Sequence, residues 1–239
     1  MQDSIMNIIF EQDEKTLAKK TAETILAQAR IIAEQKERVI MALPGGRSVS
    51  GVYEEFSQST DPVWKKIHIF LVDERLVETS DPESNFRLIK GSFAAKLVVR
   101  KILPQENLHP FITDKNTDDQ GSGKYQKLLE AYGGMFDIVL VSSGEDGHIG
   151  ALYPHHHALS VSGRRFITLH DSPKPPQDRM TASVELIANA FIVLLFIGDG
   201  KQAAFHKFND KTVAIIDCPA KIAGKAKNAV IYTNLLVDT

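Results

Sequence analysis

Three short polar segments carry the residue types that acid–base chemistry and phosphate binding require. They are residues 45–48 (GGRS), 73–75 (DER) and 144–148 (GEDGH). Glycines let backbone N–H groups approach an anion, and an arginine offers phosphate a bidentate contact. A histidine can take a proton from water while a nearby carboxylate fixes its tautomer. These segments therefore indicate an anion site and an acid–base pair.

Each segment lies at the end of a short apolar run of the kind that is typical of buried strands. The runs span residues 39–44, 67–73, 136–144, 191–200 and 229–233. Helix-length stretches lie before or between them, at residues 13–38, 49–56 and 85–99. Apolar strands separated by helices predict an α/β fold, with a mostly parallel sheet and helices on both faces. Because such sheets bind ligands at the carboxyl ends of their strands, we expect the three segments to converge on one rim.

The organisation of the chain predicts a single domain over residues 1–239, with no linker and no repeat. We expect the sheet to begin at about Val39, after one helix. We expect Ser48 to cap the helix that starts at Val49. A loop at residues 171–179, stiffened by three prolines, adds the cations Lys174 and Arg179.

Each polar segment also has a plainer interpretation. Residues 45–48 are compatible with a tight turn that bears a surface arginine, and residues 73–75 with an ion-paired turn. His148 is one of eight histidines, and most histidines are structural. The functional interpretation is favoured because all three segments follow predicted strands. The glycines at 144–150 lack the G-x-G-x-x-G spacing, and two neighbouring acids would repel a pyrophosphate, so no nicotinamide cofactor is expected.

Other conspicuous residues are not expected to form a site. His155, His156 and His157 are adjacent, and adjacent side chains on a helix or strand diverge, so we expect a solvated loop and no metal. Cys218 is the single cysteine, which excludes a disulfide framework, and it is assigned to packing. Lys201 follows Gly198-Asp199-Gly200, but Gln202 comes next, so this segment is not a Walker motif.

Composition narrows the class of protein further. The 239 residues include 28 Lys and Arg against 30 Asp and Glu, a net charge of -2, which argues against nucleic acid as a partner. The longest apolar run, residues 190–197, is far shorter than the roughly 20 residues that span a bilayer. The N-terminus lacks the basic region and apolar core of a signal peptide. We therefore expect a cytoplasmic protein with no membrane contact, as a monomer or weak homodimer.

With these motifs in this order, the chain resembles the 6-phosphogluconolactonase family, within the wider group that includes glucosamine-6-phosphate deaminase. The resemblance runs through nearly the whole chain, in residues 43–53, 70–86, 136–154, 172–181 and 197–205. It implies a Rossmann-like fold of the sugar-phosphate isomerase type. It also implies a cofactor-free hydrolase that converts 6-phospho-D-glucono-1,5-lactone to 6-phosphogluconate in the oxidative pentose phosphate pathway.

The resemblance also implies roles for individual residues. His148 would be the general base that activates water, with Asp146 and Asp73 orienting it or the sugar hydroxyls. Arg75 and Asn85 match substrate-contacting positions. The phosphate would lie among the cations and the glycine-rich turn, which are Gly45, Gly46, Arg47, Ser48, Lys174 and Arg179.

The sequence departs from the family at two places. Residues 149–153 read IGALY where lactonases usually have TASLF, and residues 141–144 read VSSG where LGMG is common. The deaminase branch typically has a tyrosine in place of Arg75 and a glutamate in place of Tyr153, which favours the lactonase. A deaminase-like isomerase and a non-catalytic sugar-phosphate sensor stay as alternatives. Such sensors usually carry a basic helix-turn-helix, for which the chain before Val39 leaves no room.

Overall fold

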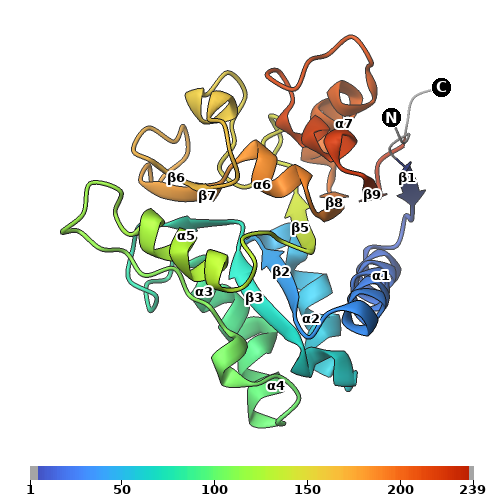
Figure 1. Cartoon of the computed structure of the whole chain (residues 1–239). Helices are drawn as coiled ribbons and strands as arrows, with labels where there is room; N and C mark the ends of the chain where they lie inside the picture. Colours follow the sequence, from blue (N-terminus) through green and yellow to red (C-terminus); the bar gives the residue numbers. More distant parts are fainter. Residues whose placement is uncertain (1–4, 237–239) are drawn as a thin grey trace.

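The structure, a computed structural model, describes residues 5–236 and is built around a parallel sheet of order β1-β9-β8-β5-β2-β3 (Figure 1). Its strands are β1 (Ile5–Phe10), β2 (Val39–Leu43), β3 (Ile67–Leu71), β5 (Ile138–Ser142), β8 (Phe191–Phe196) and β9 (Asn228–Thr233). Every residue of β2 and β3 is buried, which explains why these strands are apolar apart from His68. The mostly parallel α/β sheet predicted from the sequence is confirmed.

The sheet begins earlier than the sequence indicated. Strand β1 precedes the first helix and pairs in parallel with β9, from Met6 opposite Ala229 to Phe10 opposite Thr233. It lies at the edge of the sheet, and Met6, Ile8 and Phe10 are each more than two-fifths exposed. The expected start at Val39 is therefore wrong, since a half-exposed edge strand lacks the pattern of a buried one.

The helices agree with the expected ones and add others. They are α1 (Glu14–Gln35), α2 (Ser50–Gln58), α3 (Asn85–Ile89), α4 (Ala95–Val99), α5 (Ser122–Ala131), α6 (Val184–Ala188) and α7 (Gln202–Asn209), with a π-helical turn at Lys90–Ala94. Short 3₁₀ helices lie at Arg47–Val49, Pro62–Lys65, Gln105–Asn107, His157–Ser160, Asp199–Lys201 and Pro219–Lys225. The side chain of Asp13 accepts the Thr16 N–H and caps α1. The stretch at 85–99 is thus α3, the π turn and α4 in succession.

Helices cover both faces of the sheet because its connections run in two directions. α1 and α2 pack against each other, and they connect β1 to β2 and β2 to β3. From β3 the chain runs back toward the other edge, through β5, β8 and β9. Right-handed crossovers in opposite directions place their helices on opposite faces. The stretch at 85–99 is an exception, since its π-helical turn packs against α2 although it follows β3. Among residues 5–236, no helix combines the length and the apolar character needed to cross a membrane.

A second, antiparallel sheet was not predicted from the sequence. It consists of β4 (Asp73–Arg75), β7 (Arg179–Ala182) and β6 (Phe166–Leu169), in the order β4-β7-β6. The segment at 73–75 is therefore a strand and not a turn. Val72, just beyond β3, accepts a hydrogen bond of 2.7 Å from the Ala182 N–H, so the small sheet sits at the carboxyl end of β3 (Figure 1). This sheet carries the loop before Arg179 to the predicted rim.

Candidate active site

His148 and Asp146 form a hydrogen-bonded pair in the tight turn after β5. Oδ1 of Asp146 lies 2.5 Å from Nδ1 of His148 and also accepts the His148 backbone N–H at 3.2 Å. Burial opposes ionisation of Asp146, but the hydrogen bonds from His148 outweigh it and hold the pKa of this carboxyl well below its usual range. The imidazole thus presents Nδ1–H to Asp146. No hydrogen bond from a residue between 5 and 236 occupies its Nε2, which can accept a proton.

The turn that holds this pair depends on the glycine that precedes it. The Gly144 N–H donates to the His148 carbonyl at 2.8 Å, and the Gly147 N–H returns to the Gly144 carbonyl at 3.1 Å. A Cβ on Gly144 would lie 2.0 Å from Cε1 of His148 and 2.1 Å from its Nδ1. Only glycine therefore leaves room for the imidazole in this position.

Tyr153 packs against the imidazole of His148. Its ring centroid lies 4.7 Å from that of His148, and the residue is 2% exposed. Burial raises the pKa of its phenol, which lies 3.0 Å from the hydroxyl of Ser172. Ser172 in turn donates to the Lys174 carbonyl. Tyr153 thus joins the histidine to the start of the 171–179 loop.

Arg179 holds that loop rather than projecting into the open site. Its Nε donates to the Pro176 carbonyl at 3.0 Å, its guanidinium reaches the carbonyls of Lys174 and Pro175, and it is 5% exposed. A third nitrogen lies 3.9 Å from a carboxylate oxygen of Asp73. Arg179 was expected among the phosphate-binding cations, but these contacts favour a role in shaping the loop.

The segment at 73–75 contributes a buried structural residue, Glu74, and two charged residues that pair with other side chains, Asp73 and Arg75. Glu74 is 2% exposed, and its carboxylate accepts the backbone N–H groups of Asn85 and Phe86, so it anchors the start of α3. Burial raises the pKa of Glu74. Asp73 faces Arg179, while a guanidinium nitrogen of Arg75 contacts the carbonyl and carboxylate of Glu83. The carboxylate that orients His148 is thus Asp146 and not Asp73.

Asn85 connects this segment to the glycine turn after β2. Its amide Nδ2 donates to the Asp73 carbonyl at 2.9 Å, and the residue is 2% exposed. A Cβ on Gly45 would lie 1.8 Å from Oδ1 of Asn85, so Gly45 must be glycine for the two to approach. The neighbouring Gly46 has φ +101°, a conformation that glycine adopts at little cost.

A partly buried lysine, Lys201, completes the glycine turn. Nζ of Lys201 donates to the hydroxyls of Ser48 and Ser142, each at 2.7 Å, and thereby joins the loops after β2, β5 and β8. Ser48 does not cap a helix as expected, because Val49 is the N-cap residue of α2 and its side chain makes no capping bond. Burial, with the positive charges of Lys174 and Arg47 nearby, lowers the pKa of Lys201 to about 8, although Glu145 opposes this.

The cations around Lys201 are placed to receive an anion. Arg47 and Lys174 are exposed, and Arg47, Ser48 and Lys201 line a hollow of about 320 Å³. Three acids, Glu14, Glu145 and Asp199, line the same hollow. Three positive charges, of which that of Lys201 is partly buried, together with a hydroxyl form a set of partners suited to a phosphate group.

The three predicted segments do converge on one rim. Lys201 links the first to the end of β5, Asn85 links the first to the second, and Gly144 and His148 lie at the end of β5 itself. Lys201 and Tyr153 were not included among the predicted site residues. Lys201 could have been found from its position between β8 and the start of α7, where a strand end meets a helix. It received no assignment from the sequence because its segment is not a Walker motif.

The three adjacent histidines do not behave as expected. His155 contacts Asp217 at 3.2 Å, whereas His156 and His157 both turn toward Asp171. The prediction that adjacent histidines diverge is therefore wrong for this pair. Among the described residues, 5–236, these two histidines and Asp171 are the one group of side chains suited in number and spacing to hold a metal ion.

Comparisons with known proteins point in one direction. Residues 12–232 match the family of glucosamine-6-phosphate isomerases/6-phosphogluconolactonase. The chain is 30% identical to 6-phosphogluconolactonase of Borreliella burgdorferi, over 81% of this chain and 83% of that protein. It is 34% identical to 6-phosphogluconolactonase of Synechocystis sp., over 73% and 72%. The crystal structure of 6-phosphogluconolactonase from Thermotoga maritima shares the fold, with a TM-score of 0.77, 22% identity and coverage of 96% and 99%.

Proposed function

The chain belongs to the glucosamine-6-phosphate isomerase/6-phosphogluconolactonase family, and from this premise we propose that it hydrolyses 6-phospho-D-glucono-1,5-lactone to 6-phosphogluconate, in the oxidative pentose phosphate pathway. The single observation that carries the chemistry is the contact of 2.5 Å between Asp146 and Nδ1 of His148. It leaves Nε2 as the acceptor that can take a proton from water. The relatives of 30–34% identity bear the same activity in their names.

The reaction needs a base and an anchor but no covalent intermediate. In the proposed mechanism, Nε2 of His148 removes a proton from a water molecule, whose oxygen forms a bond to the lactone carbonyl carbon. The tetrahedral intermediate then collapses and its bond to the ring oxygen breaks. The ring oxygen takes the proton from His148 and becomes the C5 hydroxyl. Asp146 stabilises the imidazolium in between, and a placed base of this kind is worth about 10²–10⁴-fold in rate.

The phosphate is held at a distance from the reacting carbon. We assign it to Lys201, Ser48, Arg47 and Lys174, with backbone of the glycine turn at Gly45 and Gly46. Asp73 and Asn85, which are both buried, are assigned to the sugar. Arg75 is assigned to the edge of the same site. Fixing the phosphate orients the carbonyl toward His148, which converts a loose encounter into an attack geometry.

The residue beside His148 separates the two activities of the family. A deaminase and isomerase must open a sugar ring and move protons between carbons. A second carboxylate beside the histidine is suited to carry those protons. Here the aromatic ring of Tyr153 fills that position, and burial raises the pKa of its phenol. Tyr153 is therefore a poor proton shuttle, and this favours the lactonase.

The activity is tested with freshly generated lactone. The protein is assayed by coupling the product to a dehydrogenase, with correction for spontaneous hydrolysis, and ammonia release from glucosamine 6-phosphate is measured in parallel. We expect enzyme-dependent hydrolysis of the lactone and no ammonia. Ammonia release without lactonase activity would instead establish the deaminase, and tight binding of 6-phosphogluconate without turnover would establish a sensor.

We also propose that the enzyme works in the cytoplasm, as a monomer or weak homodimer made of one catalytic domain. A doubly charged sugar phosphate does not cross a bilayer unaided, so an enzyme acting on it belongs where the substrate is made. Gel filtration at assay concentration, with activity measured across the peak, tests the oligomeric state.

A further inference from the structure

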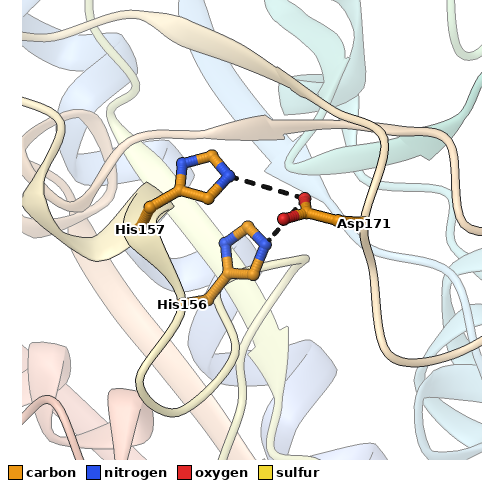
Figure 2. Close-up of side chains that lie close together, drawn as sticks. All are labelled: His156, His157 and Asp171. Carbon is orange, nitrogen blue, oxygen red and sulfur yellow. Dashed lines mark hydrogen bonds and ion pairs between the residues drawn. The ribbon is translucent and has the colours of Figure 1, made fainter.

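Two histidines and one aspartate outside the proposed active site point toward one another. Nε2 of His156 lies 3.0 Å from Oδ1 of Asp171, and Nε2 of His157 lies 3.4 Å from the same oxygen (Figure 2). The three potential donor atoms all lie within 4.8 Å of one another. The proposed mechanism uses none of these side chains.

The backbone explains how adjacent histidines face the same way. His156 is extended, with φ -79° and ψ 142°, whereas His157 is the first residue of a 3₁₀ helix. The change from extended to helical backbone between them rotates the second side chain back toward the first. Their ring centroids are 4.2 Å apart, and the angle between the ring planes is 33°. Both rings therefore present Nε2 to Asp171, as Figure 2 shows.

We propose that His156, His157 and Asp171 form a binding site for one Zn²⁺ ion, with water completing the coordination. Two imidazoles and a carboxylate are a donor set that Zn²⁺ uses where it keeps an open position. At zinc–ligand distances of about 2.0–2.1 Å, tetrahedral donors lie about 3.3 Å apart. The contacts of 3.0 and 3.4 Å to Asp171 are close to that separation.

The surroundings of the three side chains fit an ion that enters from solvent. The side chain of His156 is 9% exposed and supplies a fixed ligand, while those of His157 and Asp171 are about three-fifths exposed and free to adjust. Nδ1 of His156 accepts the Ala158 N–H at 3.2 Å. Binding Zn²⁺ through Nε2 replaces the contact of that nitrogen with Asp171 by a metal–ligand bond, moves the ring proton to Nδ1 and breaks the long hydrogen bond from Ala158.

The site would join two segments that approach the active site. Asp171 precedes Ser172, at the start of the loop that carries Lys174, and His156 follows closely after Tyr153. Ser172 and Tyr153 already share a hydrogen bond. A Zn²⁺ ion would add a second connection between the same two segments, so its binding is expected to raise the melting temperature of the protein.

The test measures Zn²⁺ binding to the untagged full-length chain, by competition with a chromophoric chelator and by metal analysis after dialysis. We expect one Zn²⁺ per chain and a higher melting temperature with Zn²⁺. Asp171→Asn and His157→Gln should each weaken binding about tenfold or more and abolish the thermal shift. Circular dichroism shows whether each variant is folded.

Two further variants serve as matched controls. His155→Gln alters a histidine one position away that faces Asp217, and His148→Ala removes the proposed base, which has its own carboxylate partner. Both are expected to bind Zn²⁺ as the unchanged chain does. The proposal is overturned by the absence of stoichiometric binding at micromolar Zn²⁺. Binding that survives in Asp171→Asn, or that is lost in either control, also overturns it.

Discussion

The contact between Asp146 and His148 decides which nitrogen of the imidazole can act as a base. Because the aspartate occupies Nδ1, the proton-accepting position is Nε2. The same carboxylate stays ionised, since its pKa is held well below the usual range, and it stabilises the imidazolium that forms during attack. The sequence predicted both residues but left open whether Asp146 or Asp73 plays this part, because only the folded turn fixes the distance.

Replacing the carboxylate alone tests this assignment. Asp146→Asn keeps the shape of the side chain but removes the charge that favours Nδ1–H and the imidazolium. We expect kcat for the lactone to fall by about 10²-fold, while KM changes little. Asp178→Asn removes the carboxylate of another His–Asp pair, the exposed contact of 2.8 Å with His170, and should leave kcat unchanged. Equal kcat values for Asp146→Asn and the unchanged chain would remove Asp146 from the mechanism.

The low pKa of Lys201 gives phosphate binding a pH dependence. Burial first, then Lys174 and Arg47, lower this pKa to about 8, so the free protein loses the lysine charge as pH rises through that value. We expect the affinity for the stable product 6-phosphogluconate to fall above pH 8 and to hold below it. Lys201→Arg keeps its charge and should lose this step, whereas Lys201→Met should bind about ten- to hundredfold more weakly at pH 7. Calorimetric titration measures the affinity of each protein for 6-phosphogluconate. An affinity of the unchanged chain that does not vary up to pH 9.5 would contradict the assignment of Lys201 to the phosphate.

At the scale of the elements, the site is made by the polar segments at the carboxyl ends of the buried strands. The buried strands are predictable from sequence because they are almost entirely apolar, and their ends in turn locate the polar segments. The edge strand β1 and the small sheet β4-β7-β6 are not predictable in this way. β1 is half exposed, and β4 has three residues that are held in place by pairing with β7, about 100 positions further along the chain. Lys201 was missed for a related reason, since its two serine partners are distant in sequence.

The turn after β5 offers a direct test at this scale. In Gly144→Ala the added Cβ would meet the imidazole of His148 at 2.0 Å, so the ring must move from its position beside Asp146. We expect kcat to fall about 10²-fold with a small loss of stability. Gly224→Ala is the matched control, because a Cβ there meets nothing within 4 Å. Retention of full activity in Gly144→Ala would show that the turn does not fix the histidine.

At the scale of the whole molecule, strand order brings the site together. β8, β5, β2 and β3 are neighbours in the sheet, so loops that are far apart in sequence meet at their carboxyl ends. His68 of β3 forms a second histidine pair, with His109, away from the catalytic residues in sequence. His68 and His109 are both less than a tenth exposed. Nδ1 of His68 lies 3.0 Å from Nε2 of His109. Burial, and then the neighbouring His68, lower the pKa of His109 to about 4.

This buried pair predicts how stability depends on pH. Between about pH 6.5 and 4 the unfolded chain protonates His109 and the folded chain does not, so stability falls as pH falls through this window. The loss from this residue is at most about 3 kcal/mol. His109→Gln should give a shallower slope of unfolding free energy against pH than the unchanged chain, measured by urea denaturation. Equal slopes would show that His109 titrates alike in both states.

The most direct measurement of the central claim compares lactone hydrolysis by the unchanged chain and by His148→Ala. Fresh 6-phosphogluconolactone is used, spontaneous hydrolysis is subtracted, and binding of 6-phosphogluconate is measured on the same preparations. We predict that His148→Ala loses about 10²–10⁴-fold in kcat. It should still bind 6-phosphogluconate, because the residues assigned to the phosphate are unchanged. Undiminished hydrolysis by His148→Ala would contradict a histidine-activated water.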